Sequence, residues 1–109
     1  MEDKRRSRRI NFREAVQFQT KSYIEPAGCL ACDLSESGIK LNNNGFIAPN
    51  EEMSLTLQLA WGNQINLQGR VVWVQRVPHS EYYQMGLEFA TRPVDSPNLE
   101  KLKEYVQSH

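Results

Sequence analysis

The run 53-MSLTLQL-59 alternates apolar and polar residues over its whole length. A period of two puts its methionine and three leucines on one face, as in a β-strand that buries one side. Gly62-Asn63 follows and predicts a hairpin turn, after which residues 65–74 predict the returning strand. This part of the chain therefore predicts an antiparallel sheet with a one-sided apolar core.

Further short strands lie on both sides of this hairpin. We predict them at residues 15–19, 23–33, 38–41 and 82–89. Runs of turn-forming residues, Asn42 to Gly45 and Pro78 to Glu81, predict tight reversals that include an exposed His79. The alternation changes phase near Gly69, which predicts a bulge there and assigns Trp73 to the core.

The period changes to that of a helix near the end of the chain. Leu99, Leu102 and Val106 fall on one side of a 3.6-residue repeat, with Ser96 as the expected N-cap and Pro97 in the first turn. We expect residues 93–109 to form a C-terminal α-helix. The predicted fold is all-β: a small six-stranded antiparallel β-barrel whose helix covers one opening.

Length and composition favour a single cytoplasmic domain. The chain has 109 residues, enough for a core without disulfides, and no apolar run long enough to span a membrane. Cys29 and Cys32 form a C-x-x-C pair, but the two histidines of the chain do not complete a zinc ligand set. We expect two reduced thiols in a strand and no metal.

The charge is divided unevenly along the chain. Residues 1–13 hold six Lys/Arg and two Asp/Glu, a net +4, whereas residues 14–109 hold seven and eleven, a net −4. We expect residues 1–12 to form a flexible basic arm ahead of a barrel over residues 13–92. Such an arm suits a small anionic ligand better than duplex DNA, which calls for a larger basic surface. A solvated tail is the alternative.

Two short sequence signatures, one of them in the arm, carry groups suited to binding a small anion with guanine edges. The first is RRSRR at residues 5–9, an R-x-x-x-R, and the second is DLSESG at residues 33–38, a D-x-S-x-x-G. Arginine forks donate to guanine O6 and N7 or to phosphate, and the Asp33 carboxylate accepts from the N–H edge of guanine. Ser35 donates to a phosphate or holds the turn, and Gly38 permits a close backbone approach or a positive φ.

The two signatures, in this order and on either side of a strand pair, resemble those of the PilZ domain family. The resemblance extends to Ile10 after the second arginine, to GRVVWV at residues 69–74 and to MGLEF at residues 85–89. It implies a receptor for the bacterial second messenger cyclic di-GMP. Arg5 and Arg9 are the pair that matches the motif, and Arg6 or Arg8 shares the phosphates. The residues implied to bind cyclic di-GMP are Arg5, Arg6, Arg9, Asp33, Ser35 and Gly38.

The resemblance also implies a mechanism. The arm becomes ordered over the nucleotide, and the new surface is recognised by an unidentified effector protein of motility, polysaccharide or envelope machinery. Lys4, an extra cation beside the motif, favours two stacked nucleotides over one. We expect a monomer, with a dimer as the alternative, and no cofactor.

Other functions remain open from the sequence. No catalytic triad, paired metal ligands or phosphate-loop glycine pattern occurs, so we do not expect an enzyme. One alternative is a PilZ-like protein-interaction module that does not bind nucleotide. Another is a binder of single-stranded RNA or DNA, although such barrels present several exposed aromatic platforms along a groove.

Overall fold

A computed structural model describes residues 8–21, 27–60 and 62–109 of the chain. Strands dominate this part, and a short 3-10 turn leads into one helix at the C-terminal end. The strands are β1 Arg9–Asn11, β2 Ala15–Gln19, β3 Ala27–Ser35, β4 Gly38–Asn43, β5 Glu52–Gln58, β6 Gln64–Arg76 and β7 Tyr83–Phe89. The helical elements are η1 Pro93–Asp95 and α1 Ser96–Gln107.

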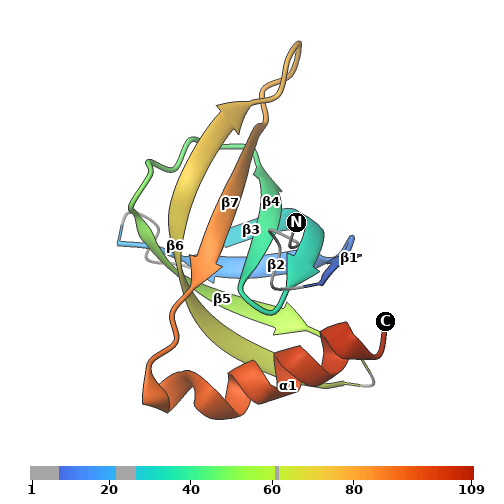
Figure 1. Cartoon of the computed structure of the whole chain (residues 1–109). Helices are drawn as coiled ribbons and strands as arrows, with labels where there is room; N and C mark the ends of the chain where they lie inside the picture. The colour runs from blue at the N-terminus through green and yellow to red at the C-terminus, as the bar shows by residue number, and fades with distance from the viewer. Residues whose placement is uncertain (1–7, 22–26, 61) are drawn as a thin grey trace, which may run out of the picture.

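The strands close into an antiparallel barrel (Figure 1). Their order is β1-β3-β2-β5-β6-β7-β4, and the additional pairing of β3 with β4 closes a ring of six. Among the described strands β1 pairs with β3 alone, and it lies outside this ring. The predicted six-stranded barrel with a C-terminal helix is confirmed. β1 was not predicted, and it brings residues 9–11 of the expected arm into the sheet.

The apolar face of each strand points into the barrel. In β5 the alternation of the sequence becomes an alternation of buried and more exposed side chains, and Met53, Leu55 and Leu57 are all buried. α1 lies across one opening of the barrel (Figure 1) and inserts Leu102 and Val106 into the same core. Packing against the barrel therefore stabilises a helix that would be marginal alone.

The bulge in β6 lies at Val72, not at Gly69. Gly69 keeps regular register with Met53 and Phe89, whereas the pairing with β7 shifts between Val71 and Trp73. One inserted residue reverses the faces of the residues that follow it. Val71 is fully buried, but Trp73 points outward with 39% of its surface exposed. The prediction that Trp73 lies in the core is therefore wrong.

Two other expectations need correction: the reversal of the chain after β4 and the N-cap of α1. Asn42 to Gly45 does not return the chain to a neighbouring strand, because β4 pairs with β3 and β7, whereas β5 pairs with β2 and β6. The N-cap of α1 is Asp95, one residue before the predicted Ser96. The turn between β6 and β7 is as predicted, and His79 is exposed there with a φ of 60°.

The two cysteines are free thiols in β3. Within the described ranges, no cluster of His, Cys, Asp and Glu is arranged to hold a metal ion. Nor does any helix in this part of the chain have the length and apolar character needed to cross a bilayer.

Candidate functional site

One row of residues crosses four neighbouring strands on the outer face of the barrel. Asp33 in β3 lies opposite Lys40 in β4, Lys40 opposite Gly86 in β7, and Gly86 opposite Trp73 in β6. Residues that face each other across antiparallel strands project from the same side of the sheet. The barrel thus arranges a carboxylate, an ammonium group, a glycine and an indole in one line.

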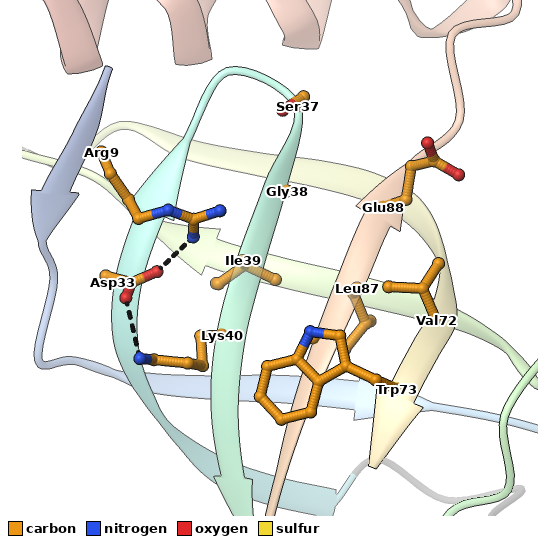
Figure 2. A pocket seen from close by; sticks show the side chains of 11 residues that line it. Arg9, Asp33, Ser37, Gly38, Ile39, Lys40, Val72, Trp73, Leu87 and Glu88 are labelled. Carbon is orange, nitrogen blue, oxygen red and sulfur yellow. Dashed lines mark hydrogen bonds and ion pairs between the residues drawn. The ribbon is translucent and has the colours of Figure 1, made fainter. Parts of the chain in front are cut away.

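This row forms the floor of a hollow of about 450 Å³ (Figure 2). The first residue of β1 and the β3–β4 turn border it on one side, and β6 borders it on the other. Its lining consists of Arg9, Asp33, Ser37, Gly38, Ile39, Lys40, Val72, Trp73, Gly86, Leu87 and Glu88. Polar and apolar surfaces both contribute, as they do in sites for small polar ligands.

Two cations share the single carboxylate in the row. Arg9 Nη1 lies 2.7 Å from Asp33 Oδ1, and Lys40 Nζ lies 3.3 Å from Asp33 Oδ2. Figure 2 shows both side chains converging on Asp33 from opposite sides. The three side chains carry one positive charge in excess, and Arg9 and Lys40 remain partly open to solvent. This part of the hollow therefore attracts anions.

The aromatic end of the row depends on a glycine. The indole of Trp73 extends from β6 over β7 (Figure 2), and a Cβ at position 86 would overlap its nitrogen and lie 2.6 Å from Cε2. Only glycine allows this position of the ring. The hollow thus offers a partly exposed aromatic face beside its charged groups.

The β3–β4 turn is held by a buried serine. Ser35 is 1% exposed, and its Oγ accepts hydrogen bonds from the N–H groups of Ser37, at 3.2 Å, and Gly38, at 3.1 Å. Gly38 packs on β7 so closely that a Cβ would overlap the carbonyl oxygen of Leu87. Of the alternatives for these residues, the structure favours turn formation by Ser35 and close backbone approach by Gly38, which has no positive φ.

A PilZ domain family model matches residues 3–108 of the chain. The chain belongs to the PilZ domain family. A search of curated protein sequences finds no match.

Several solved structures share the fold of this domain. Bacillus subtilis MotI/DgrA, an inhibitor of motility, has a TM-score of 0.80 at 22% identity, over 97% of this chain and 51% of that one. The complex of K. pneumonia MrkH with c-di-GMP has a TM-score of 0.73 at 21% identity, over 97% and 52%. The PilZ domain of Escherichia coli YcgR with c-di-GMP has a TM-score of 0.74 at 11% identity, over 97% and 91%. The chain spans about half the length of MotI and MrkH.

The PilZ signatures of the sequence meet in the hollow only in part. Arg9 and Asp33 form an ion pair there, and Gly38 belongs to the lining. Ser35 lies beneath the turn and does not reach the hollow. Arg5 and Arg6 lie outside the described residues.

Arg8 points elsewhere in this structure. Its guanidinium group donates a hydrogen bond to the backbone carbonyl of His109, two residues beyond the last residue of α1. Arg8 does not line the hollow, so the structure does not bring it to Asp33.

Lys40 and Trp73 line the hollow of this PilZ domain, although the sequence did not mark either as a site residue. For Lys40 a signal was present, because it lies two residues after Gly38 in an alternating strand and so shares its face. Trp73 was assigned to the core from its place in an alternating strand, and the bulge at Val72 reverses that alternation before it.

Proposed function

We propose that this PilZ domain is a cyclic di-GMP receptor whose ligand binds in the hollow over Asp33, Lys40, Gly86 and Trp73. The observation that carries the proposal is the Arg9–Asp33 pair of 2.7 Å, because it joins the two halves of the family signature at one place on the barrel. No catalytic step is proposed for the domain.

The groups in the hollow fit a guanine nucleotide. The two oxygens of Asp33 accept from the N1–H and N2–H₂ donors of guanine, and the Arg9 fork donates to O6 and N7 or to a phosphate oxygen. The exposed face of Trp73 supplies an apolar surface on which a base stacks. A cyclic dinucleotide, with two bases and two phosphodiesters, uses all three kinds of group.

The basic arm is joined to the barrel at the border of the hollow, so it can contribute to ligand binding. β1 begins at Arg9, at the border of the hollow, and Arg5 is four residues upstream. Four residues of extended chain span about 14 Å at most, which keeps Arg5 and Arg6 within reach of a bound nucleotide. Their ordering over the ligand costs conformational entropy and creates a new surface, which we propose is recognised by an effector protein.

The comparisons support this proposal at the level of the family. The solved structures of MrkH and of the YcgR PilZ domain both contain c-di-GMP, and MotI is described as an inhibitor of motility. Their sequence identities to this chain are low, so the assignments of Arg9 and Asp33 rest on the geometry of the hollow, and those of Arg5 and Arg6 rest on the family signature.

Isothermal titration calorimetry tests the proposal. Cyclic di-GMP, GTP and a short single-stranded oligonucleotide are titrated at two salt concentrations, which also measures ligand stoichiometry. We expect selective binding of cyclic di-GMP. Binding of the oligonucleotide alone would favour a nucleic-acid binder, and binding of none of the three would favour an interaction module; either result contradicts the proposal.

Arginine variants connect the binding to the signature. Arg9→Ala is expected to weaken binding at least tenfold, about 1.4 kcal/mol, because it removes the fork beside Asp33. Arg5→Ala is expected to do the same. Arg13→Ala is the matched control, since Arg13 is exposed, carries the same charge and does not line the hollow. Equal affinities for all three variants would remove the assignment.

A further inference from the structure

We infer that Lys40 is a phosphate-binding residue of this site, and that it exchanges Asp33 for a ligand phosphate when the nucleotide binds. This inference rests on the proposed function and extends it to a residue outside both family signatures. Lys40 comes from the middle of a barrel strand, whereas Arg9, the other cation among the described residues of the lining, is the first residue of β1.

The register of the sheet puts Lys40 at the centre of the row. It lies opposite Asp33 on one side and Gly86 on the other, and the Trp73 indole covers Gly86. A ligand that contacts both the carboxylate and the indole therefore passes over Lys40 (Figure 2). The Lys40 side chain is about one-third exposed and belongs to the lining of the hollow, so a ligand that lies there can contact it.

The two ion pairs of Asp33 differ in length. Arg9 lies at hydrogen-bonding distance, 2.7 Å, whereas Lys40 Nζ lies 3.3 Å from the other oxygen. An ammonium on a flexible four-carbon stem has three donors and no fixed direction, whereas the guanidinium fork is planar and preorganised. Lys40 is therefore the cation that moves at lower cost.

The charges in the hollow favour the exchange in which Lys40 leaves Asp33 and contacts a ligand phosphate. A guanine edge that donates to both Asp33 oxygens competes with Lys40 for Oδ2. A lysine that loses its carboxylate next to a dianionic ligand gains a phosphate oxygen in place of it. The total number of charge-assisted contacts is then maintained, and no cation remains buried and unpaired beneath the nucleotide.

A neighbouring ion pair offers a matched control. Arg70 Nη2 lies 3.3 Å from Glu88 Oε1, the same separation as in the Lys40–Asp33 pair, and it is also on the outer face of the barrel. Glu88 borders the hollow, but Arg70 does not line it. Removing Arg70 changes the net charge as much as removing Lys40, without removing a group from the hollow.

The experiment is calorimetric titration of cyclic di-GMP into the wild-type chain and four variants: Lys40→Met, Arg70→Met, Asp33→Asn and the double variant Asp33→Asn/Lys40→Met. We expect Lys40→Met to weaken binding about fivefold or more and to reduce its salt dependence, while Arg70→Met binds like the wild type. The double variant is expected to bind more weakly than Asp33→Asn, because the phosphate contact does not require Asp33.

Three results would overturn the role of Lys40 while leaving the proposed function intact: Lys40→Met binds like the wild type, Arg70→Met loses as much affinity as Lys40→Met, or the double variant equals Asp33→Asn. The last result would mean that Lys40 acts only by holding the carboxylate. A wild-type chain that does not bind cyclic di-GMP would overturn the proposed function itself, and the assignment of Lys40 with it.

Discussion

The indole of Trp73 occupies the space that a side chain at Gly86 would fill. A Cβ at position 86 would overlap the indole nitrogen and lie 2.6 Å from Cε2 and 3.0 Å from Cδ1. Gly86→Ala should therefore displace the ring from the floor of the hollow. Trp73 is on the outer face and can swing into solvent, so we expect the free energy of unfolding to change by less than about 2 kcal/mol.

The binding measurement makes this prediction specific. If Trp73 stacks on a base, Gly86→Ala and Trp73→Ala should weaken cyclic di-GMP binding by similar factors, on the order of tenfold, since stacking on an aromatic side chain contributes about 1–3 kcal/mol per base. Thermal unfolding checks that both variants remain folded. Full affinity in either folded variant would show that the indole does not contact the ligand.

Gly38→Ala, unlike Gly86→Ala, is predicted to destabilise the fold. The atom that a Cβ would overlap there is the backbone carbonyl oxygen of Leu87, in a paired strand, and it has no free direction in which to move. Gly38→Ala should force β4 and β7 apart and destabilise the fold by about 1–3 kcal/mol, as overpacking in a core does. Chemical denaturation measures this loss. An unchanged free energy of unfolding would mean that the strands yield easily at this point.

One part of the candidate site could be predicted from the sequence, and another part could not. Arg9 and Asp33 belong to motifs, and their meeting follows once the strands that carry them are predicted. Trp73 could not be found in this way. Its orientation depends on the bulge at Val72, which is defined by the register between β6 and β7. The change of phase in the sequence indicated a bulge but placed it at Gly69.

Two other features, β1 and the role of Lys40, were difficult to predict from the sequence for physical reasons. β1 has three residues, of which only Ile10 is buried, so it is too short to show a period. Lys40 shares the outer face of β4 with Gly38, but its place in the site appears only when the cross-strand neighbours Asp33 and Gly86 are known. The alternation of apolar residues along the strands thus predicted the barrel, whereas the register between the strands determines which residues meet in the candidate site.

Ser35 is predicted to act through stability. Its buried Oγ is the acceptor for two N–H groups of the β3–β4 turn, so Ser35→Ala leaves both without this partner. We expect a cost of about 1–3 kcal/mol in unfolding free energy. Asp33→Asn alters only a partly exposed charge cluster and should cost about 1 kcal/mol or less, while it weakens binding more strongly. Denaturation and calorimetry on both variants separate the roles; the reverse pattern would contradict them.

Stability below neutral pH should depend on Asp95, which joins η1 to α1. Hydrogen bonds from the Arg92 side chain, at 2.9 and 3.0 Å, lower the pKa of Asp95 below its ordinary value of 3.8. A lowered pKa in the folded state contributes stability above the ordinary value, and this contribution is lost as the pH falls through the lowered value. The difference in melting temperature between wild type and Asp95→Asn should therefore be constant from pH 7 to about 5 and shrink below 3.8. A difference that does not change with pH would exclude the ionised carboxylate as its source.

Cys29 is predicted to be a poor nucleophile as long as the barrel is folded. Burial, together with the neighbouring Cys32, raises the pKa of the Cys29 thiol from 9.0 to about 12, and its Sγ lies 3.7 Å from the carbonyl oxygen of Val16. Because the thiolate is the reactive form, alkylation at pH 8 should be roughly a thousandfold slower in the folded chain than in denaturant. In a Cys32→Ser variant Cys29 is the sole thiol, and burial, the larger cause of the raised pKa, is retained. The rate of iodoacetamide modification, followed by mass spectrometry in buffer and in urea, measures the ratio. Rates within tenfold of each other would show that the thiol is accessible and ionisable in the folded barrel.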